Sequence, residues 1–135
     1  MDEIIRNRKP DIKLSLHDAH ITGIKIENDS LKFKFNYIYD YSGKEEKQRK
    51  ANIIFKEVDL DFCRITLLKE KGKKVTGKAY MLEEYVKKHK HIDLEIISET
   101  YTGYDTIWTG YSYGKKMREF FIELWNHGDM IYKVW

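Results

Sequence analysis

The clearest pattern in the chain is an alternation of apolar and polar residues over two neighbouring runs near the amino terminus. A period of two is typical of strands that bury only one face. Between the runs, Asn28-Asp29 supplies residues that tolerate the left-handed backbone of a tight turn, so the pattern predicts an antiparallel hairpin. The apolar positions of this hairpin are Ile24, Ile26, Leu31, Phe33, Phe35 and Tyr37.

Shorter alternating runs predict more strands along the rest of the chain. The polar segment 40–50 is expected to be an exposed loop, and turns are expected near Gly72 and Gly103. Segment 115–125 fits helical spacing as well as strand alternation. We favour a strand, because its early lysines would be unfavourable at a helix N-terminus. The predicted strands cover residues 51–58, 62–68, 92–96, 100–113, 115–125 and 130–134.

One helix is predicted at about residues 78–89. Leu82, Tyr85 and Val86 fall on one side of it, while acidic residues come early and lysines late, as the helix dipole prefers. Residues 1–13 carry mixed charges around Pro10 and are expected to form a mobile lead-in.

Together these elements predict a single domain over residues 1–135 of mostly β or α+β class. The expected architecture is an antiparallel sandwich or a partly closed barrel of about seven or eight strands, with the helix packed against it. The sequence has neither alternating βαβ units nor a glycine-rich phosphate loop, which excludes the parallel sheets on which nucleotide-binding motifs depend.

Composition and charge narrow the functional classes. Hydrophobic content of 41% and aromatic content of 14% argue against disorder. The chain has 25 basic and 22 acidic residues, so its net charge is only +3. With so small a net charge, neither nucleic acid nor an anionic membrane is an expected partner. No apolar run approaches about 18 residues, so no membrane-spanning helix is expected. The single Cys63 and the polar first residues favour a cytoplasmic location.

His17, Asp18 and His20 are candidate binding residues, because imidazoles beside a carboxylate suit metal binding or proton transfer. On an extended backbone His17 and Asp18 point to opposite faces, so no set of three ligands forms locally. We favour a structural role for Asp18, in which it fixes the start of the first strand through backbone hydrogen bonds. His89 and His91 would also need ligands from another segment, so neither a metal nor a cofactor is expected.

The segment from Tyr101 to Gly114 concentrates aromatic residues. Tyr and Trp rings are what a sugar, a nucleic-acid base or a protein partner contacts. Rings at alternate positions are also what a sheet buries, so packing in the core or at its rim is favoured over ligand contact. The candidate binding residues in this segment are Tyr101, Tyr104, Trp108, Tyr111 and Tyr113.

Basic residues gather in segments 44–50 and 69–78. Both segments also contain acidic residues, which reduce their net positive charge: Glu45, Glu46 and Glu70. Solvated loops are therefore the favoured interpretation. Cys63 lies in an apolar run and is expected to be a buried thiol rather than a nucleophile. No standard catalytic motif occurs, so the sequence leans away from an enzyme.

The segment LHDAHITGIKIENDSLKFKF, residues 16–35, resembles the start of several families of small bacterial proteins. In them a His-Asp-small pattern, here His17-Asp18-Ala19, precedes a β-hairpin. Some of these families are similar to the immunity proteins encoded beside polymorphic toxins. The resemblance implies a protein that binds and neutralises a partner protein, with no cofactor and no chemistry.

Protein binding without catalysis, as in an immunity-type toxin antagonist, is therefore the favoured function. The alternative is a small-molecule-binding barrel or a hydrolase whose pocket is lined by the aromatic segment, with help from His17, Asp18 and His20. A deep cavity on which these side chains converge would favour the alternative, whereas a filled interior with the rings outside would favour a protein interface.

Overall fold

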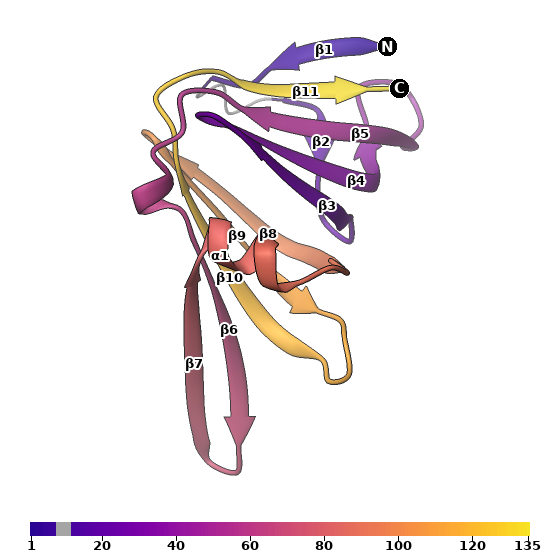
Figure 1. Cartoon of the computed structure of the whole chain (residues 1–135). Helices are drawn as coiled ribbons and strands as arrows, with labels where there is room; N and C mark the ends of the chain where they lie inside the picture. The colour runs from indigo at the N-terminus through magenta and orange to yellow at the C-terminus, as the bar shows by residue number, and fades with distance from the viewer. Residues whose placement is uncertain (8–11) are drawn as a thin grey trace.

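The computed structural model describes residues 1–7 and 12–135. It consists of one antiparallel sheet with one α-helix, α1 (Leu82–Lys88), and one 3-10 turn, η1 (Leu60–Phe62) (Figure 1). The strands in chain order are β1 (Asp2–Ile5), β2 (Leu14–Ser15), β3 (His20–Glu27), β4 (Ser30–Asp40), β5 (Lys47–Phe55), β6 (Arg64–Lys71), β7 (Lys74–Met81), β8 (Leu94–Thr102), β9 (Asp105–Ser112), β10 (Arg118–Trp125) and β11 (Met130–Val134).

The strand order is β1-β11-β5-β4-β3-β8-β9-β10-β6-β7, with the short β2 added on β4. We call the first five strands of this order the first half-sheet and the last five the second half-sheet. Strands β3 and β8 join them through two residue pairs, His20 with Glu95 and Ile21 with Leu94, and backbone hydrogen bonds of Asp18 and Ala19 with Ile96 extend this junction. Their strands run in different directions in Figure 1. The order ends on β1 and β7, so the sheet is not closed.

The core lies between the half-sheets and is centred on Trp108 of β9, which is fully buried. Its ring centroid lies 5.0 Å from that of Phe33, 5.9 Å from Phe35 and 5.6 Å from Phe55, all in edge-on geometry. These phenylalanines belong to β4 and β5, so the contacts join the two half-sheets. Edge-on aromatic pairs each contribute about 0.5–1.5 kcal/mol beyond the burial of apolar area.

The antiparallel β class and the hairpin predicted from alternation are confirmed. Leu31, Phe33 and Phe35 are buried while the lysines between them are exposed, and Asn28 has the left-handed φ of 53° that the turn requires. Segment 118–125 is a strand, as favoured, and the turn at Gly103 has a φ of +55°. These features depend on local spacing and turn chemistry, which the sequence displays directly.

Several boundaries in the prediction are wrong. Within residues 1–7 and 12–135 the sheet has eleven strands rather than seven or eight. Residues 78–81 are not helical, because Lys74–Met81 forms β7 and pairs with β6 across the Gly72 turn. Part of the expected loop at 40–50 belongs to β5, which begins at Lys47.

The first residues also differ from the expected lead-in. Asp2–Ile5 forms β1 and pairs with β11, which is near the other end of the chain. Arg6 follows and is buried. The rest of the segment predicted as a mobile lead-in includes residues 8–11, which lie outside the described part of the chain.

The helix α1 follows β7 directly and contacts it, β6 and β3. Leu82 and Tyr85 form its buried side, and the Tyr85 ring stacks on His89 with centroids 4.1 Å apart. Among residues 1–7 and 12–135, no helix has both the length and the apolar character needed to cross a membrane.

Gly110 is required by a close approach between β8 and β9. A Cβ at this position would lie 1.8 Å from the carbonyl oxygen of Glu95, a distance that only strand separation would relieve. We expect Gly110→Ala to lower the free energy of unfolding by more than about 3 kcal/mol in urea titrations. Gly43→Ala is the control, because no atom lies within 4 Å of its added Cβ. Equal stabilities of the two variants would contradict this packing.

Candidate functional site

Aromatic side chains from three separate segments meet on the surface at one end of the sheet. Phe62 belongs to η1, Tyr104 to the β8–β9 turn, Trp125 to the end of β10 and His127 to the turn that follows. We call these four residues the aromatic surface. Ring centroids are 6.2 Å apart for Phe62 and Trp125, 5.5 Å for Tyr104 and Trp125, and 4.6 Å for Tyr104 and His127. Phe62 is 57% exposed and Tyr104 is 40% exposed.

The backbone around the aromatic surface is held by a dense set of local hydrogen bonds. The amide N–H of His127 donates to the carbonyl of Glu57, and the side chain of Asn126 donates to the carbonyl of Gly128. A Cβ on Gly128 would lie 2.8 Å from the carbonyl oxygen of Lys56, so this turn needs glycine. Glu57 adopts a φ of 51°, an uncommon value for a side-chain-bearing residue.

His127 is fixed in one tautomer by its neighbour. The indole N–H of Trp125 donates to Nε2 of His127 over 3.1 Å, so Nε2 is the acceptor and the ring proton lies on Nδ1. The ring therefore presents a donor at Nδ1.

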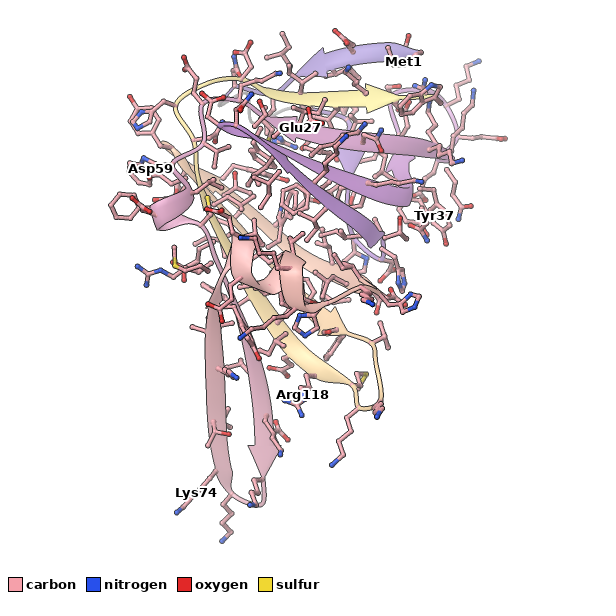
Figure 2. All side chains as sticks on the ribbon, in the orientation of Figure 1. Met1, Glu27, Tyr37, Asp59, Lys74 and Arg118 are labelled. Carbon is pink, nitrogen blue, oxygen red and sulfur yellow. The ribbon has the colours of Figure 1, made fainter. Side chains whose placement is uncertain are left out.

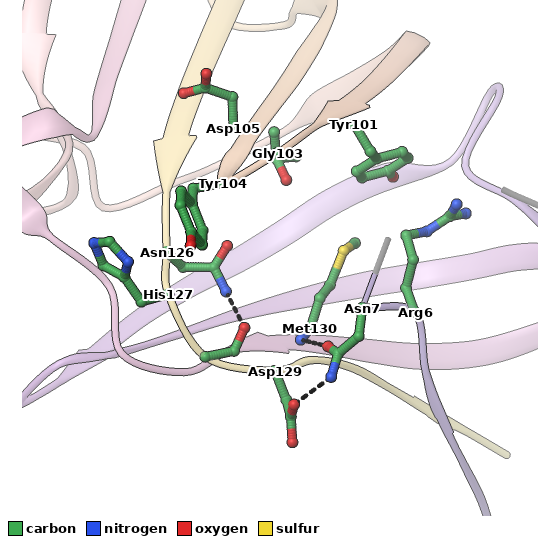
Figure 3. Close-up of a pocket in the computed structure, with 12 residues that line it drawn as sticks. Arg6, Asn7, Tyr101, Gly103, Tyr104, Asp105, Asn126, His127, Asp129 and Met130 are labelled. Carbon is green, nitrogen blue, oxygen red and sulfur yellow. Dashed lines mark hydrogen bonds between the residues drawn. The ribbon is translucent and has the colours of Figure 1, made fainter. Parts of the chain in front are cut away.

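A hollow of about 620 Å³ lies beside the aromatic surface (Figure 3). Tyr104 and His127 lie on one side of it, and Tyr101 and Arg6 lie on the other. The residues that line it are Arg6, Asn7, Tyr101, Gly103, Tyr104, Asp105, Thr106, Asn126, His127, Gly128, Asp129 and Met130.

The polar groups at the inner end of this hollow are hydrogen-bonded to one another. The Tyr101 hydroxyl donates to Oε1 of Glu99 over 2.6 Å and accepts from the indole N–H of Trp108 over 3.1 Å. Arg6 donates to the Tyr132 hydroxyl over 2.9 Å, and its guanidinium lies 4.2 Å from the centre of the Tyr101 ring. Burial raises the pKa values of Tyr101 and Tyr132, so both keep their protons at neutral pH. This network supports the fold.

Carboxylates border the other side of the aromatic surface. A second hollow, of about 700 Å³, reaches His127 and is open to solvent. We call its carboxylates the acidic border. Figure 2 shows Asp59 at this end of the molecule, away from Lys74 at the tip of the β6–β7 hairpin. The acidic border consists of Asp29, Glu57, Asp59, Asp61 and Glu83.

The aromatic candidates from the sequence are divided among three places. Trp108 is in the core and Tyr101 lies beside it in the buried network. Tyr104 alone belongs to the aromatic surface. Tyr111 lies on the other face of β9 from Trp108. Tyr113 follows the end of β9 and stacks on the ring of His20.

His20 has acidic neighbours at the narrow junction of the half-sheets. Its Nδ1 lies 2.5 Å from a carboxylate oxygen of Asp93, and its Nε2 lies 3.7 Å from Glu95. Tyr113 stacks on the His20 ring and donates to Glu95 over 2.6 Å. The hydrogen bond to Glu95 raises the pKa of Tyr113 to about 12. The cluster ties β3 to β8 on the outer face of the sheet.

His17 and Asp18 form a separate exposed pair, with Nδ1 and Oδ2 3.1 Å apart, and His20 is not part of it. Asp18 has a φ of 66°, and its amide N–H donates to the carbonyl of Ile96. Its left-handed backbone therefore turns the chain into β3. Within residues 1–7 and 12–135, no three side chains of His, Cys, Asp or Glu are grouped so as to hold a metal ion.

Phe62, Trp125 and His127 were missed as candidates. Phe62 stands at the start of a run predicted to be a strand, and Trp125 is the last apolar position of a strand. The available signal was the turn Asn126-His127-Gly128-Asp129, because an aromatic residue beside a tight turn at a strand end is difficult to bury.

Comparison with known proteins gives no relative. No family model, curated protein or solved structure matches this chain.

Cys63 is buried, as the sequence predicted, and burial raises its pKa to about 11. At pH 8 only about one thiol in a thousand would then be ionised. We expect a thiol-reactive disulfide reagent to leave the folded protein unmodified over hours at pH 8, and to modify it within minutes in guanidinium. Rapid reaction of the folded protein would contradict the buried position.

Proposed function

We propose that this domain works by binding another protein through the aromatic surface, without catalysing a reaction. The observation that carries the proposal is a group of rings on the outside of the molecule, in which Trp125 contacts both Phe62 and Tyr104. Aromatic residues are enriched at the energetic centres of protein interfaces, because they bury large areas at a low cost in side-chain entropy.

The filled interior favours an interface over an internal ligand site. Trp108 occupies the space between the half-sheets and contacts phenylalanines of both β4 and β5. A barrel that binds a small molecule would leave a cavity at this place. The hollow beside Tyr104 is instead open at the surface, so it suits an anchoring side chain from a partner.

The partner surface that fits this end of the domain is basic. The acidic border lies next to the aromatic rings, and His127 lines both hollows. Lysine or arginine side chains of a partner would pair with these carboxylates, and arginine would also stack on the rings. Charge complementarity of this kind raises association rates and selects among partners.

An immunity-type antagonist is the specific form of the proposal. The resemblance of residues 16–35 implies a protein that neutralises its partner by forming a stable complex. Such an antagonist needs an interface that excludes water and no catalytic group, and the aromatic surface meets that requirement.

The proposal is tested by placing a photo-crosslinking phenylalanine analogue at position 62 and illuminating the protein in a lysate of its source cells. The matched control carries the analogue at position 75, because Val75 is 64% exposed but lies on the β6–β7 hairpin. We expect position 62 to capture one protein stoichiometrically, and position 75 to capture it at least about tenfold less.

Charge reversal supplies the second part of this test. Asp29→Lys combined with Asp61→Lys should abolish capture at position 62, while Glu45→Lys combined with Glu46→Lys, the same change in charge on a distant loop, should leave it intact. Equal capture at positions 62 and 75, or insensitivity to reversal of the acidic border, would refute the proposal.

A further inference from the structure

The β6–β7 hairpin extends beyond the rest of the sheet. On β6 the last residue paired with β10 is Leu68, whereas the pairing with β7 continues to Lys71 and Lys74 at the tip. Figure 1 shows the hairpin projecting away from the other strands. Nearly every residue of β7 is exposed. The tip is therefore a two-stranded ribbon with solvent on both faces.

The register sorts the side chains of this ribbon by charge. Residues directly opposite each other share a face, and so do alternate residues along one strand. Lys71 pairs with Lys74, Lys69 with Thr76, and Leu67 with Lys78. The other face carries the pairs Glu70 with Val75 and Leu68 with Gly77. We call the first of these faces the lysine face; its lysines are Lys69, Lys71, Lys74 and Lys78.

Glu70, which dilutes the basic segment in the sequence, is thus on the opposite face of the ribbon. No salt bridge among the described residues involves a lysine of the lysine face. Lys71 and Lys74 stand directly opposite each other, an arrangement that destabilises a strand pair. The folded hairpin therefore holds a concentrated positive charge without a salt bridge among the described residues, although Lys78, after Lys88, helps to lower the pKa of Glu84 in α1.

The basic character continues from the ribbon to α1. Tyr80 lies on the same face as Lys78, two positions further along β7, and the Lys78 ammonium is 4.9 Å from its ring centre. The Lys88 ammonium of α1 lies 5.6 Å from the same ring. Lys88 pairs with Glu84, so this carboxylate offsets part of the positive charge at the base of the hairpin, while Lys69, Lys71 and Lys74 lie nearer its tip.

We propose that the lysine face binds the phosphate backbone of a nucleic acid, without reading its sequence. Four lysines from two strands on one face of a projecting ribbon match the uniform charge of a phosphate backbone, and a two-stranded β-ribbon fits the major groove of a duplex. Lysines are point charges, and the lysine face has no Asn, Gln or Arg to read base edges. The exposed apolar Val75 lies on the other face, so insertion into a membrane would turn the lysines away from the lipid.

The test is fluorescence anisotropy of a labelled mixed-sequence DNA duplex of about 20 base pairs, titrated with the full chain over a series of salt concentrations. With about four phosphates neutralised, the logarithm of the binding constant should fall with the logarithm of salt concentration with a slope of about −3 to −4. Single-stranded RNA of equal length, tested in parallel, should show a shallower slope.

The matched variants are Lys71→Glu with Lys74→Glu, and Lys47→Glu with Lys50→Glu. Both change the charge equally, and the residues are exposed at all four positions. The hairpin variant keeps like charges opposite each other, so its melting temperature should stay near that of the unmodified chain. We expect it to weaken duplex binding at least about tenfold at 50 mM salt and to halve the slope, while the control changes binding less than about threefold.

Three results would overturn the proposal. The first is no binding of duplex at 50 mM salt with protein at about 100 µM, the weak end for sequence-independent binding. The second is equal weakening by the two variants, which would assign binding to overall charge. The third is that the protein binds phosphatidylserine vesicles or polyglutamate through these lysines but does not bind the duplex. Phe62→Ala should leave duplex binding unchanged, which separates this site from the aromatic surface.

Discussion

The structure depends on the burial of Trp108 between the two half-sheets. The ladder between β3 and β8 has two residue pairs, and flanking backbone hydrogen bonds of Asp18 and Ala19 with Ile96 extend it, so side-chain packing is also needed to keep the half-sheets face to face. Trp108 contacts Phe33, Phe35 and Phe55 from the opposite half-sheet. Its buried N–H needs an acceptor, which the Tyr101 hydroxyl supplies. Because this packing fills the interior, the surfaces available for binding lie at the ends of the sheet and on its projecting hairpin.

Local patterns predicted much of this fold. The hairpin around Asn28 followed from a period of two and from turn chemistry, both of which are readable over a few residues. The pairing of β1 with β11 was not predictable, because it joins the two ends of the chain. Residues 78–81 at the end of β7 were predicted to be helical, because the exposed residues of this strand show little alternation of apolar and polar side chains. The need for glycine at position 110 depends on a contact with Glu95 that only the assembled sheet creates.

The candidate site illustrates the same limit. Tyr104 was predicted from the sequence, but the rings around it come from positions 125 and 127, and that of Phe62 reaches them through Trp125, so only three-dimensional assembly brings the group together. The distribution of charge on the surface also depends on three-dimensional assembly. The net charge of +3 conceals a separation in which carboxylates border the aromatic surface and lysines line one face of the β6–β7 hairpin. Strand register, rather than composition, decides that Glu70 does not neutralise its neighbours.

One shared core is expected to make the half-sheets a single cooperative unit. Native-state hydrogen exchange at increasing denaturant concentration tests it most directly, through the amides of Ile53 in β5 and Ile122 in β10, both fully buried residues in opposite half-sheets. We expect the two opening free energies to be equal within about 0.5 kcal/mol and to depend on denaturant in the same way. A difference above about 2 kcal/mol, with one half-sheet opening while the other stays protected, would contradict it.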